Sequence, residues 1–153
     1  MSDILYFAYG SNLAEEKIRK VLGRKPESVP TRLRGYRLAF NKDSRNWTYA
    51  ANVEPTPRCV VWGAAYKCTA GDMEKLDACE KGYHRVTVQV EGPDRNVLEA
   101  VTYIANAPVH HPDRCPKPEY LKLILDGAKE QKISRGYRRK VRLEAAKAGA
   151  QHG

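Results

Sequence analysis

The chain has 153 residues, of which 42% are hydrophobic and 29% are charged, the composition of an ordinary globular protein. This length favours a single domain, which we place at residues 1–147, followed by a frayed tail at 148–153. No apolar run approaches the roughly 20 residues that a membrane helix needs. The start of the chain puts an acid, Asp3, before a short apolar run, whereas a secretory signal places basic residues before a longer one. We therefore expect a cytoplasmic protein without a membrane partner.

The formal net charge of +9 is concentrated near the C-terminus, where residues 129–147 carry eight basic and two acidic side chains. Such a cluster is usually the solvated face of a helix, but a basic module that binds nucleic acid is the alternative. Its candidate contacts are Arg135, Arg138, Arg139, Lys140 and Arg142. These residues spread around a helix, and Tyr137 is the one aromatic residue beside them that could stack on a base. We expect no nucleic-acid partner.

The first half of the chain predicts one helix among several strands. Residues 4–9 form a short, continuously apolar run that indicates a buried strand. Turn residues follow, and residues 15–22 then predict a helix for which Ser11 or Asn12 is the candidate N-cap. Alternation at 34–41 predicts a strand with one buried face. We expect further strands at 47–53 and 59–68.

The second half begins with a predicted helix and a hairpin. Thr69 and Asp72 have the spacing of a capping box and predict a helix over 70–79. Two strands at 84–91 and 97–105 form the arms of the hairpin. After an irregular loop at 108–118, helices are expected at 119–130 and 134–146. Strands outnumber helices and follow one another as hairpins, which predicts an α+β fold with a mostly antiparallel, barrel-like sheet.

The turn after the first strand is one candidate for chemistry. Gly10, Ser11 and Asn12 stand between a buried strand and a helix, where consecutive backbone amides can point into one concavity. That geometry suits an anion or a developing oxyanion. The same three residues also make an ordinary turn, so the motif alone leaves both interpretations open.

Glu80 is the other candidate. On a helix, Met73, Leu76 and Glu80 fall on one stripe, and the two apolar residues identify that stripe as the inward one. Burial would raise the pKa of the Glu80 carboxyl above its ordinary value of about 4.3, which suits a general base. The alternative is an acid at the helix C-terminus that pairs with Lys81 or Arg85.

The cysteines and histidines give no metal or nucleophile signature. The four cysteines lack metal-ligand spacing, so we expect reduced, mostly packed thiols, although the sequence leaves two disulfides open. They are Cys59, Cys68, Cys79 and Cys115. Three histidines have no serine or cysteine signature near them, and we expect them on the surface or packed in a loop. They are His84, His110 and His111.

Five segments resemble, in order, the γ-glutamylcyclotransferase family over residues 4 to about 145. The run YFAYGSNL at residues 6–13 resembles the family's opening signature. Four further blocks follow at residues 36–41, 61–66, 76–80, and 118–122 with 127–130. An eight-residue signature followed by four ordered blocks is far more specific than a short motif.

The resemblance implies a small mixed, mostly antiparallel β-barrel flanked by helices. It also implies an enzyme that converts a γ-glutamyl compound into 5-oxoproline and a free amine without a metal or cofactor. In this reading Glu80 takes a proton from the substrate's α-amino group. By matching position, the substrate-binding residues are Tyr6 and Tyr9 at the pocket floor, Gly10, Ser11 and Asn12 through their backbone amides, and Tyr120 on the helical side.

One departure from the family concerns the residue after Glu80. Family members commonly have glycine there, whereas in this chain Lys81 precedes Gly82, and Lys81 would favour an acidic leaving group. The substrate therefore stays open among γ-glutamyl amino acids or dipeptides, γ-glutamyl amines and γ-glutamyl-protected intermediates of secondary metabolism. A non-catalytic, ligand-binding relative of the same fold is a further alternative. We expect a small-molecule γ-glutamyl partner and a monomer or homodimer.

Overall fold

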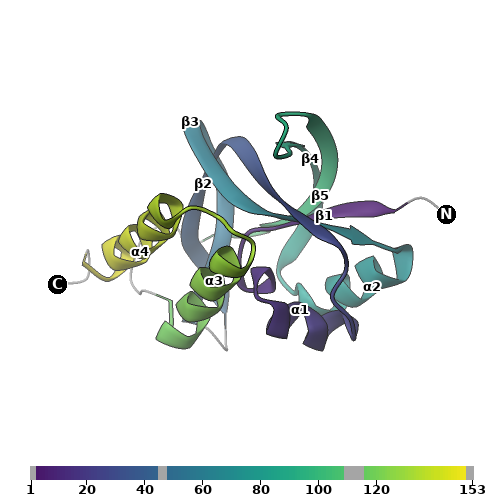
Figure 1. Cartoon of the computed structure of the whole chain (residues 1–153). Coiled ribbons are helices and arrows are strands. Elements are labelled where there is room, and N and C mark those ends of the chain that lie inside the picture. Colours follow the sequence, from purple (N-terminus) through teal and green to yellow (C-terminus); the bar gives the residue numbers. More distant parts are fainter. Residues whose placement is uncertain (1–2, 45–47, 109–115, 151–153) are drawn as a thin grey trace.

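The computed structural model describes residues 3–44, 48–108 and 116–150, and these residues form a closed barrel of five strands (Figure 1). The strands are β1 (Ile4–Ala8), β2 (Ser28–Ser44), β3 (Thr48–Cys68), β4 (Tyr83–Glu91) and β5 (Val97–Ala105). Their order around the barrel is β1-β3-β2-β4-β5. Neighbouring strands are antiparallel except β1 and β5, which pair in parallel where Tyr6 lies beside Val101. The predicted α+β fold with a mixed, mostly antiparallel barrel is confirmed.

The long hairpin of β2 and β3 was predicted only in pieces. The two strands pair from Ser28 beside Tyr66 to Ser44 beside Thr48, far beyond the predicted strands at 34–41, 47–53 and 59–68. Prolines and a glycine interrupt the alternation, but the pairing continues across two register shifts of the kind that β-bulges produce. Trp47, at the start of one predicted strand, lies outside the described residues.

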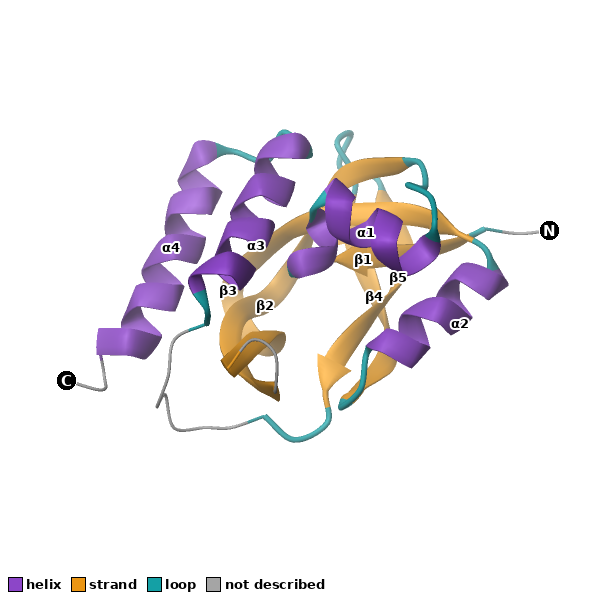
Figure 2. Ribbon diagram, turned by 90° about the horizontal axis from the view of Figure 1, so that it is seen from below, coloured by secondary structure: helices purple, strands orange, loops and turns teal. Residues whose placement is uncertain are grey.

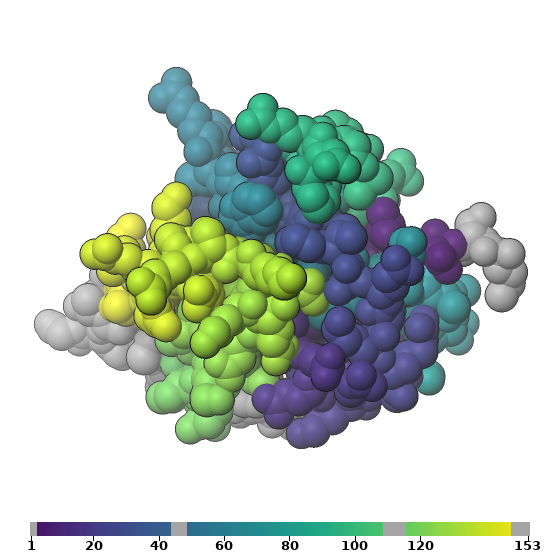
Figure 3. All heavy atoms as spheres, in the orientation of Figure 1, coloured from purple at the N-terminus to yellow at the C-terminus, as the bar shows by residue number. Residues whose placement is uncertain are grey.

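The helices of the described chain lie together beside the barrel. They are α1 (Glu15–Leu22), α2 (Ala70–Cys79), α3 (Pro118–Glu130) and α4 (Arg135–Ala150), and a 3-10 turn, η1 (Ser11–Leu13), precedes α1. Figure 2 shows α3 beside α4, with α1 between α3 and α2. In Figure 3 the α3 and α4 segments, green and yellow, form one continuous surface. None of these helices has the length and apolar composition that would let it cross a membrane.

The cap of α1 differs from the prediction. Ser11 or Asn12 was expected to cap this helix, but the N-cap position is Ala14, without a side-chain cap. The carboxylate of Glu130, on α3, accepts a hydrogen bond of 2.9 Å from the backbone N–H of Glu15 instead. The prediction is wrong because Ser11 and Asn12 belong to η1, where the Asn12 amide has other partners.

The turn η1 is fixed by close contact with α3 and β3. A Cβ atom at Gly127 would lie 2.4 Å from both the carbonyl carbon of Leu13 and the backbone nitrogen of Ala14, so only glycine allows α3 to approach this closely. From the β3 side, the hydroxyl of Tyr66 donates a hydrogen bond of 2.8 Å to the carbonyl oxygen of Asn12. The backbone that links β1 to α1 is therefore held from two directions.

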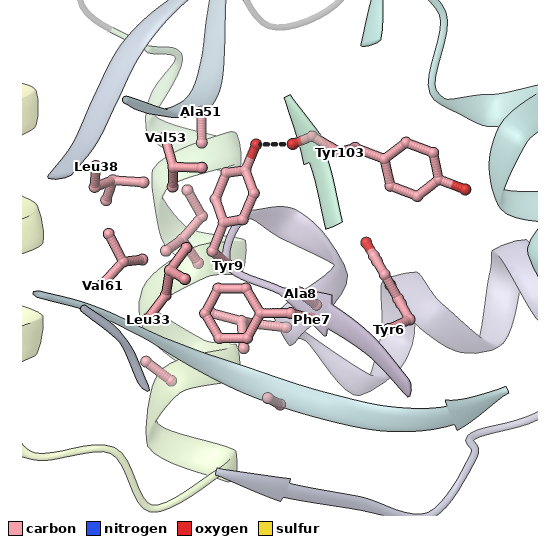
Figure 4. Close-up of a cluster of buried hydrophobic side chains, with 14 of the residues drawn as sticks. Tyr6, Phe7, Ala8, Tyr9, Leu33, Leu38, Ala51, Val53, Val61 and Tyr103 are labelled. Atoms are coloured by element: carbon pink, nitrogen blue, oxygen red, sulfur yellow. Dashed lines mark hydrogen bonds between the residues drawn. The ribbon is translucent and has the colours of Figure 1, made fainter. Parts of the chain in front are cut away.

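Both faces of β1 are buried, which explains its continuously apolar sequence. On one face the ring of Phe7 lies near that of Tyr9, with 6.3 Å between centroids. On the other face the ring of Tyr6 lies 6.1 Å from that of Tyr66 and 5.8 Å from that of Tyr103. Figure 4 shows the cluster around Phe7 and Tyr9. Its almost fully buried aliphatic members include Leu33, Val53 and Val61.

Candidate active site

A cavity of about 780 Å³ opens where η1, the end of α2, the start of β4 and α3 meet. A recess of about 50 Å³ continues it toward β1 and β5. The two spaces share Ser11, Asn12, Glu80, Tyr83 and Tyr120 in their linings. The structure therefore brings segments from both ends of the chain to one site, with Glu80 where the wide space meets the narrow one.

The backbone around Glu80 directs its side chain into this site. Helix α2 starts with the predicted capping box, in which Thr69 and Asp72 exchange hydrogen bonds. Glu80 is the C-cap of the helix, and its N–H donates to the carbonyl of Leu76 at 2.9 Å. Gly82 then adopts a left-handed conformation with φ of 84°, which turns the chain into β4. The bend at Gly82 therefore falls two residues after Glu80.

The surroundings of Glu80 contradict the ion-pair alternative. Arg85 binds Asp77 instead, through two hydrogen bonds of 2.8 and 2.6 Å. Lys81 is exposed and makes no ion pair with a described residue. Asp77 also accepts a hydrogen bond of 2.6 Å from the hydroxyl of Tyr103. The Arg85–Asp77 pair on the surface therefore helps to hold Tyr103, which lines the recess. Glu80 lines the cavity, and no cation of the described ranges forms an ion pair with it.

The pKa of Glu80 suits proton exchange at neutral pH. Burial raises the pKa of its carboxyl to about 7, against the opposing effects of the charges on Lys17 and Lys42 and of a hydrogen bond from Asn12. A group with this pKa is partly ionised at neutral pH, so it can take a proton and give it back. The sequence-based expectation of a raised pKa agrees with the structure.

Asn12 is the polar neighbour of Glu80. Its Nδ2 donates to the hydroxyl oxygen of Tyr6 at 2.9 Å and to Oε1 of Glu80 at 3.3 Å. A carboxylate requires a donor, so this contact fixes the orientation of the amide. Within the described part of the chain, the buried Oδ1 is then left without a hydrogen-bond partner. A buried acceptor beside a carboxyl group is a site for a ligand that donates several hydrogen bonds, such as an ammonium group.

Two tyrosines are fixed by the backbone of one residue in β3. Ala51 lies in the register shift between β2 and β3, where the pairing passes from Asn52 to Ala50. Its N–H donates to the hydroxyl of Tyr120 at 2.9 Å, and its carbonyl accepts from the hydroxyl of Tyr83 at 2.7 Å. The irregular pairing thus supplies backbone groups that hold both phenol rings at the junction of cavity and recess.

The other predicted tyrosines line the recess as neutral hydroxyl groups. Burial, together with the charge of Glu80, raises the pKa values of Tyr6 and Tyr9 well above the ordinary value. The hydroxyl of Tyr9 donates to the carbonyl of Tyr103 at 2.6 Å (Figure 4). All the predicted site residues line the cavity or its recess: Tyr6, Tyr9, Gly10, Ser11, Asn12, Glu80 and Tyr120.

Sequence reasoning missed several residues of the site. Tyr83 follows the Gly82 bend and begins β4. The one sequence feature that could have indicated it is its position three residues after Glu80. Lys17 and Lys42 line the wide part of the cavity. They come from α1 and β2, and no local pattern links either of them to Glu80.

Among the described residues, Cys79 lines the wide part of the cavity beside Glu80, whereas His84, Cys59 and Cys68 lie outside its lining. His84 is exposed on β4, its Nδ1 lies 2.6 Å from Oδ1 of Asn106, and it does not line the cavity. Three cysteines are free thiols, and burial raises the pKa of the Cys68 thiol to about 12. No group of three or more potential metal ligands occurs within the described ranges. Outside those ranges lie His110, His111 and Cys115.

The mixed barrel thus holds a carboxyl group with a raised pKa beside a buried amide, a candidate acid–base site. The sequence model of the family described as "Gamma-glutamyl cyclotransferase, AIG2-like" matches residues 6–122. The chain belongs to this family of enzymes.

Curated relatives and solved structures support the same assignment. The chain is 30% identical over 148 residues to proteins named γ-glutamylcyclotransferase from Mus musculus and Homo sapiens, covering 90% of this chain and 77% of each relative. A solved structure titled "Gamma-glutamyl cyclotransferase" is 27% identical, with a TM-score of 0.82 over 92% of this chain and 87% of that one. A yeast enzyme described as specific to glutathione has a TM-score of 0.74 at 15% identity, which shows a shared fold.

Proposed function

We propose that this chain converts a γ-glutamyl amino acid or γ-glutamyl amine into 5-oxoproline and a free amine, with Glu80 as the general base. The observation that carries this proposal is the buried Glu80 carboxyl, with a pKa of about 7, at the junction of cavity and recess. Beside it lies the Asn12 side chain, whose Oδ1 has no hydrogen-bond partner among the described residues. Together they offer a proton acceptor and a fixed hydrogen-bond acceptor to one ammonium group.

The reaction begins at the substrate's α-ammonium, whose pKa near 8 leaves it mostly protonated and unreactive at neutral pH. Glu80 takes one proton, and the freed amine attacks the γ-carbonyl carbon of the same molecule. A carbon–nitrogen bond forms as the ring closes, and the bond to the leaving nitrogen breaks. Overall, two protons pass from the α-nitrogen to the leaving nitrogen. Glu80 ends the cycle ionised, as it began it.

The remaining groups of the site position the substrate. Backbone amides at Gly10, Ser11 and Asn12 hold substrate oxygens, and Tyr6 and Tyr9 shape the floor of the recess. Tyr120 contacts the substrate from α3. Holding the γ-glutamyl arm in a folded, near-attack shape lowers the barrier further, as intramolecular closure does in general.

The alternatives are less well supported. In the basic helix α4, Tyr137 is 7% exposed, so the aromatic residue that a nucleic-acid module would use for stacking is buried. A non-catalytic relative has no need for a carboxyl group with a pKa of about 7 facing a cavity.

The decisive experiment is to incubate the protein with a panel of γ-glutamyl amino acids, dipeptides and amines and to measure 5-oxoproline. We expect at least one compound to be turned over. The absence of 5-oxoproline from every compound would favour the non-catalytic relative. Oligonucleotide binding that weakens steeply with salt would support the basic module instead.

The pH dependence of kcat/KM should follow Glu80. Because its carboxyl has a pKa of about 7 and acts in its ionised form, kcat/KM is expected to fall as the pH drops through 7, approaching a tenfold loss per pH unit below it. The measurement is initial rates of 5-oxoproline formation between pH 5 and pH 9. A rate that stays constant down to about pH 5 would mean that the base has an ordinary carboxyl pKa or is a different group.

A further inference from the structure

The wide part of the cavity is lined by three lysines from three different elements. Lys17 belongs to α1, Lys42 to β2 and Lys81 to the turn after α2. Two carboxyl groups, Glu80 and Asp43, are in the same lining. None of the three lysines forms an ion pair within the part of the chain that the structure describes. Among the described residues, the wide part of the cavity therefore carries three lysines against two carboxyl groups, and none of the lysines is held in an ion pair.

The ammonium group of Lys42 is held in place. Its Nζ donates a hydrogen bond of 2.6 Å to the carbonyl of Asp43 and lies 5.4 Å from the ring centroid of Tyr83. It also lies against Gly82, where a Cβ atom would be 2.9 Å from Nζ. Tyr83 and Gly82 are the residues that immediately follow the Glu80 turn. A fixed cation near the reacting base loses less conformational entropy when it binds an anion than a freely moving one.

Lys17 lines the same space from a different element, α1. It is half-buried on α1 and lines the cavity together with Ser11 and Asn12. The charges of Lys17 and Lys42 both act on the Glu80 carboxyl, which places both cations near the reacting end of the cavity. An anion in the wide part of the cavity would thus meet two ammonium groups in a partly desolvated setting, where charge pairs are stronger than on an open surface.

The position of these cations assigns them to one part of the substrate. Glu80 and Asn12 hold the α-ammonium, and the adjoining recess of about 50 Å³ has no room for more than a small group. The leaving amine must therefore extend into the space of about 780 Å³ that the lysines line. We infer that Lys17 and Lys42 bind a carboxylate on the leaving amine, so that the substrates are γ-glutamyl amino acids or γ-glutamyl peptides. γ-Glutamyl amines without an acid group are excluded as preferred substrates. This inference rests on the function proposed above.

A matched pair of substrates tests the inference. γ-Glutamyl-alanine and γ-glutamyl-alaninamide differ in one group, a carboxylate against a carboxamide. For the wild-type protein we expect kcat/KM for the carboxylate to be roughly tenfold higher or more, because two partly buried cations face it, and we expect 0.5 M salt to reduce this preference. In Lys17→Gln/Lys42→Gln the preference should fall to about twofold or less.

The ratio of kcat/KM for the carboxylate substrate to kcat/KM for the carboxamide substrate isolates the role of the lysines. Their removal also changes the pKa of Glu80, but that change acts on both substrates and cancels in the ratio. The matched control is Lys20→Gln, which removes an exposed lysine of the same helix outside the cavity lining and should keep the preference. Lys17→Glu provides a second variant, in which the carboxamide should become the better substrate.

The outcomes separate this inference from the proposed function. Formation of 5-oxoproline from both substrates at equal kcat/KM would overturn the inference and leave the cyclisation intact. A preference for the carboxylate that survives in Lys17→Gln/Lys42→Gln would also overturn it. No 5-oxoproline from either substrate, or from any other γ-glutamyl compound, would overturn the proposed function itself.

Discussion

Glu80→Gln is expected to lower the turnover of γ-glutamyl substrates by a factor of at least about 10². Glutamine keeps the size and shape of the side chain, but its amide cannot take a proton from the substrate's α-ammonium. Its amide oxygen can still accept the hydrogen bond from Nδ2 of Asn12, so the site should keep its geometry. The measurement is 5-oxoproline formation at pH 8 with saturating substrate.

The same variant provides its own test of folding. Because burial raises the pKa of Glu80 from 4.5 to about 7, the ionised carboxylate disfavours the folded state. The stability that a protonated Glu80 contributes is complete below pH 4.5 and is lost as the pH rises through 7. Glu80→Gln should therefore be more stable than the wild type at pH 8, and the difference should shrink toward pH 4.5. Chemical denaturation at several pH values measures this.

Two results would contradict the role given to Glu80. Equal turnover in both proteins would remove it from the mechanism. A free energy of unfolding that changes with pH in the same way in both proteins would show that the carboxyl is not desolvated. Glu74→Gln, an exposed acid on the same helix, is the matched control, and we expect neither its turnover nor its stability to change appreciably.

The sequence was most informative where structure depends on neighbours along the chain. The bounds of α1, α2 and β5 agree with the prediction. Helix α2 is the clearest case, because Thr69 and Asp72 satisfy each other's backbone donors within a single turn. Glu80 was also predictable, since helical spacing relates it to the buried Met73 and Leu76.

The sequence was less informative where a residue's partner lies far along the chain. Ser11 and Asn12 have the side chains of an N-cap, but α1 is capped by Glu130, which is 115 residues away from Glu15. Asn12 donates instead to Tyr6 and Glu80. Capping preferences describe an isolated helix end, and here a tertiary contact replaces the local one.

The same reason explains why parts of the site were missed. Tyr83 is held by the carbonyl of Ala51, and that carbonyl is available because the pairing of β2 with β3 shifts register there. A register shift between two long strands has no pattern in either strand alone. Lys17 and Lys42 likewise meet at the cavity only after the barrel has formed.

Gly127→Ala is expected to destabilise the protein by about 3 kcal/mol, because overpacking of a buried contact costs this much when the neighbouring backbone has to move. The added Cβ would lie 2.4 Å from backbone atoms of Leu13 and Ala14, which cannot rotate away as a side chain could. The expected shift of η1 also moves Asn12 relative to Glu80, so kcat/KM should fall by roughly tenfold or more. Urea denaturation and 5-oxoproline assays measure the two effects.

Gly136→Ala is the matched control for this prediction. It makes the same substitution in the neighbouring helix α4, where the nearest atom to the added Cβ is Oγ of Ser134 at 3.8 Å. Alanine favours a helix over glycine by up to about 1 kcal/mol, so this variant should be as stable as the wild type or more so, with unchanged activity. If Gly127→Ala behaves like Gly136→Ala, η1 does not depend on the close approach of α3. The position of Asn12 beside Glu80 would then have to be set by β1 and by Tyr66 alone.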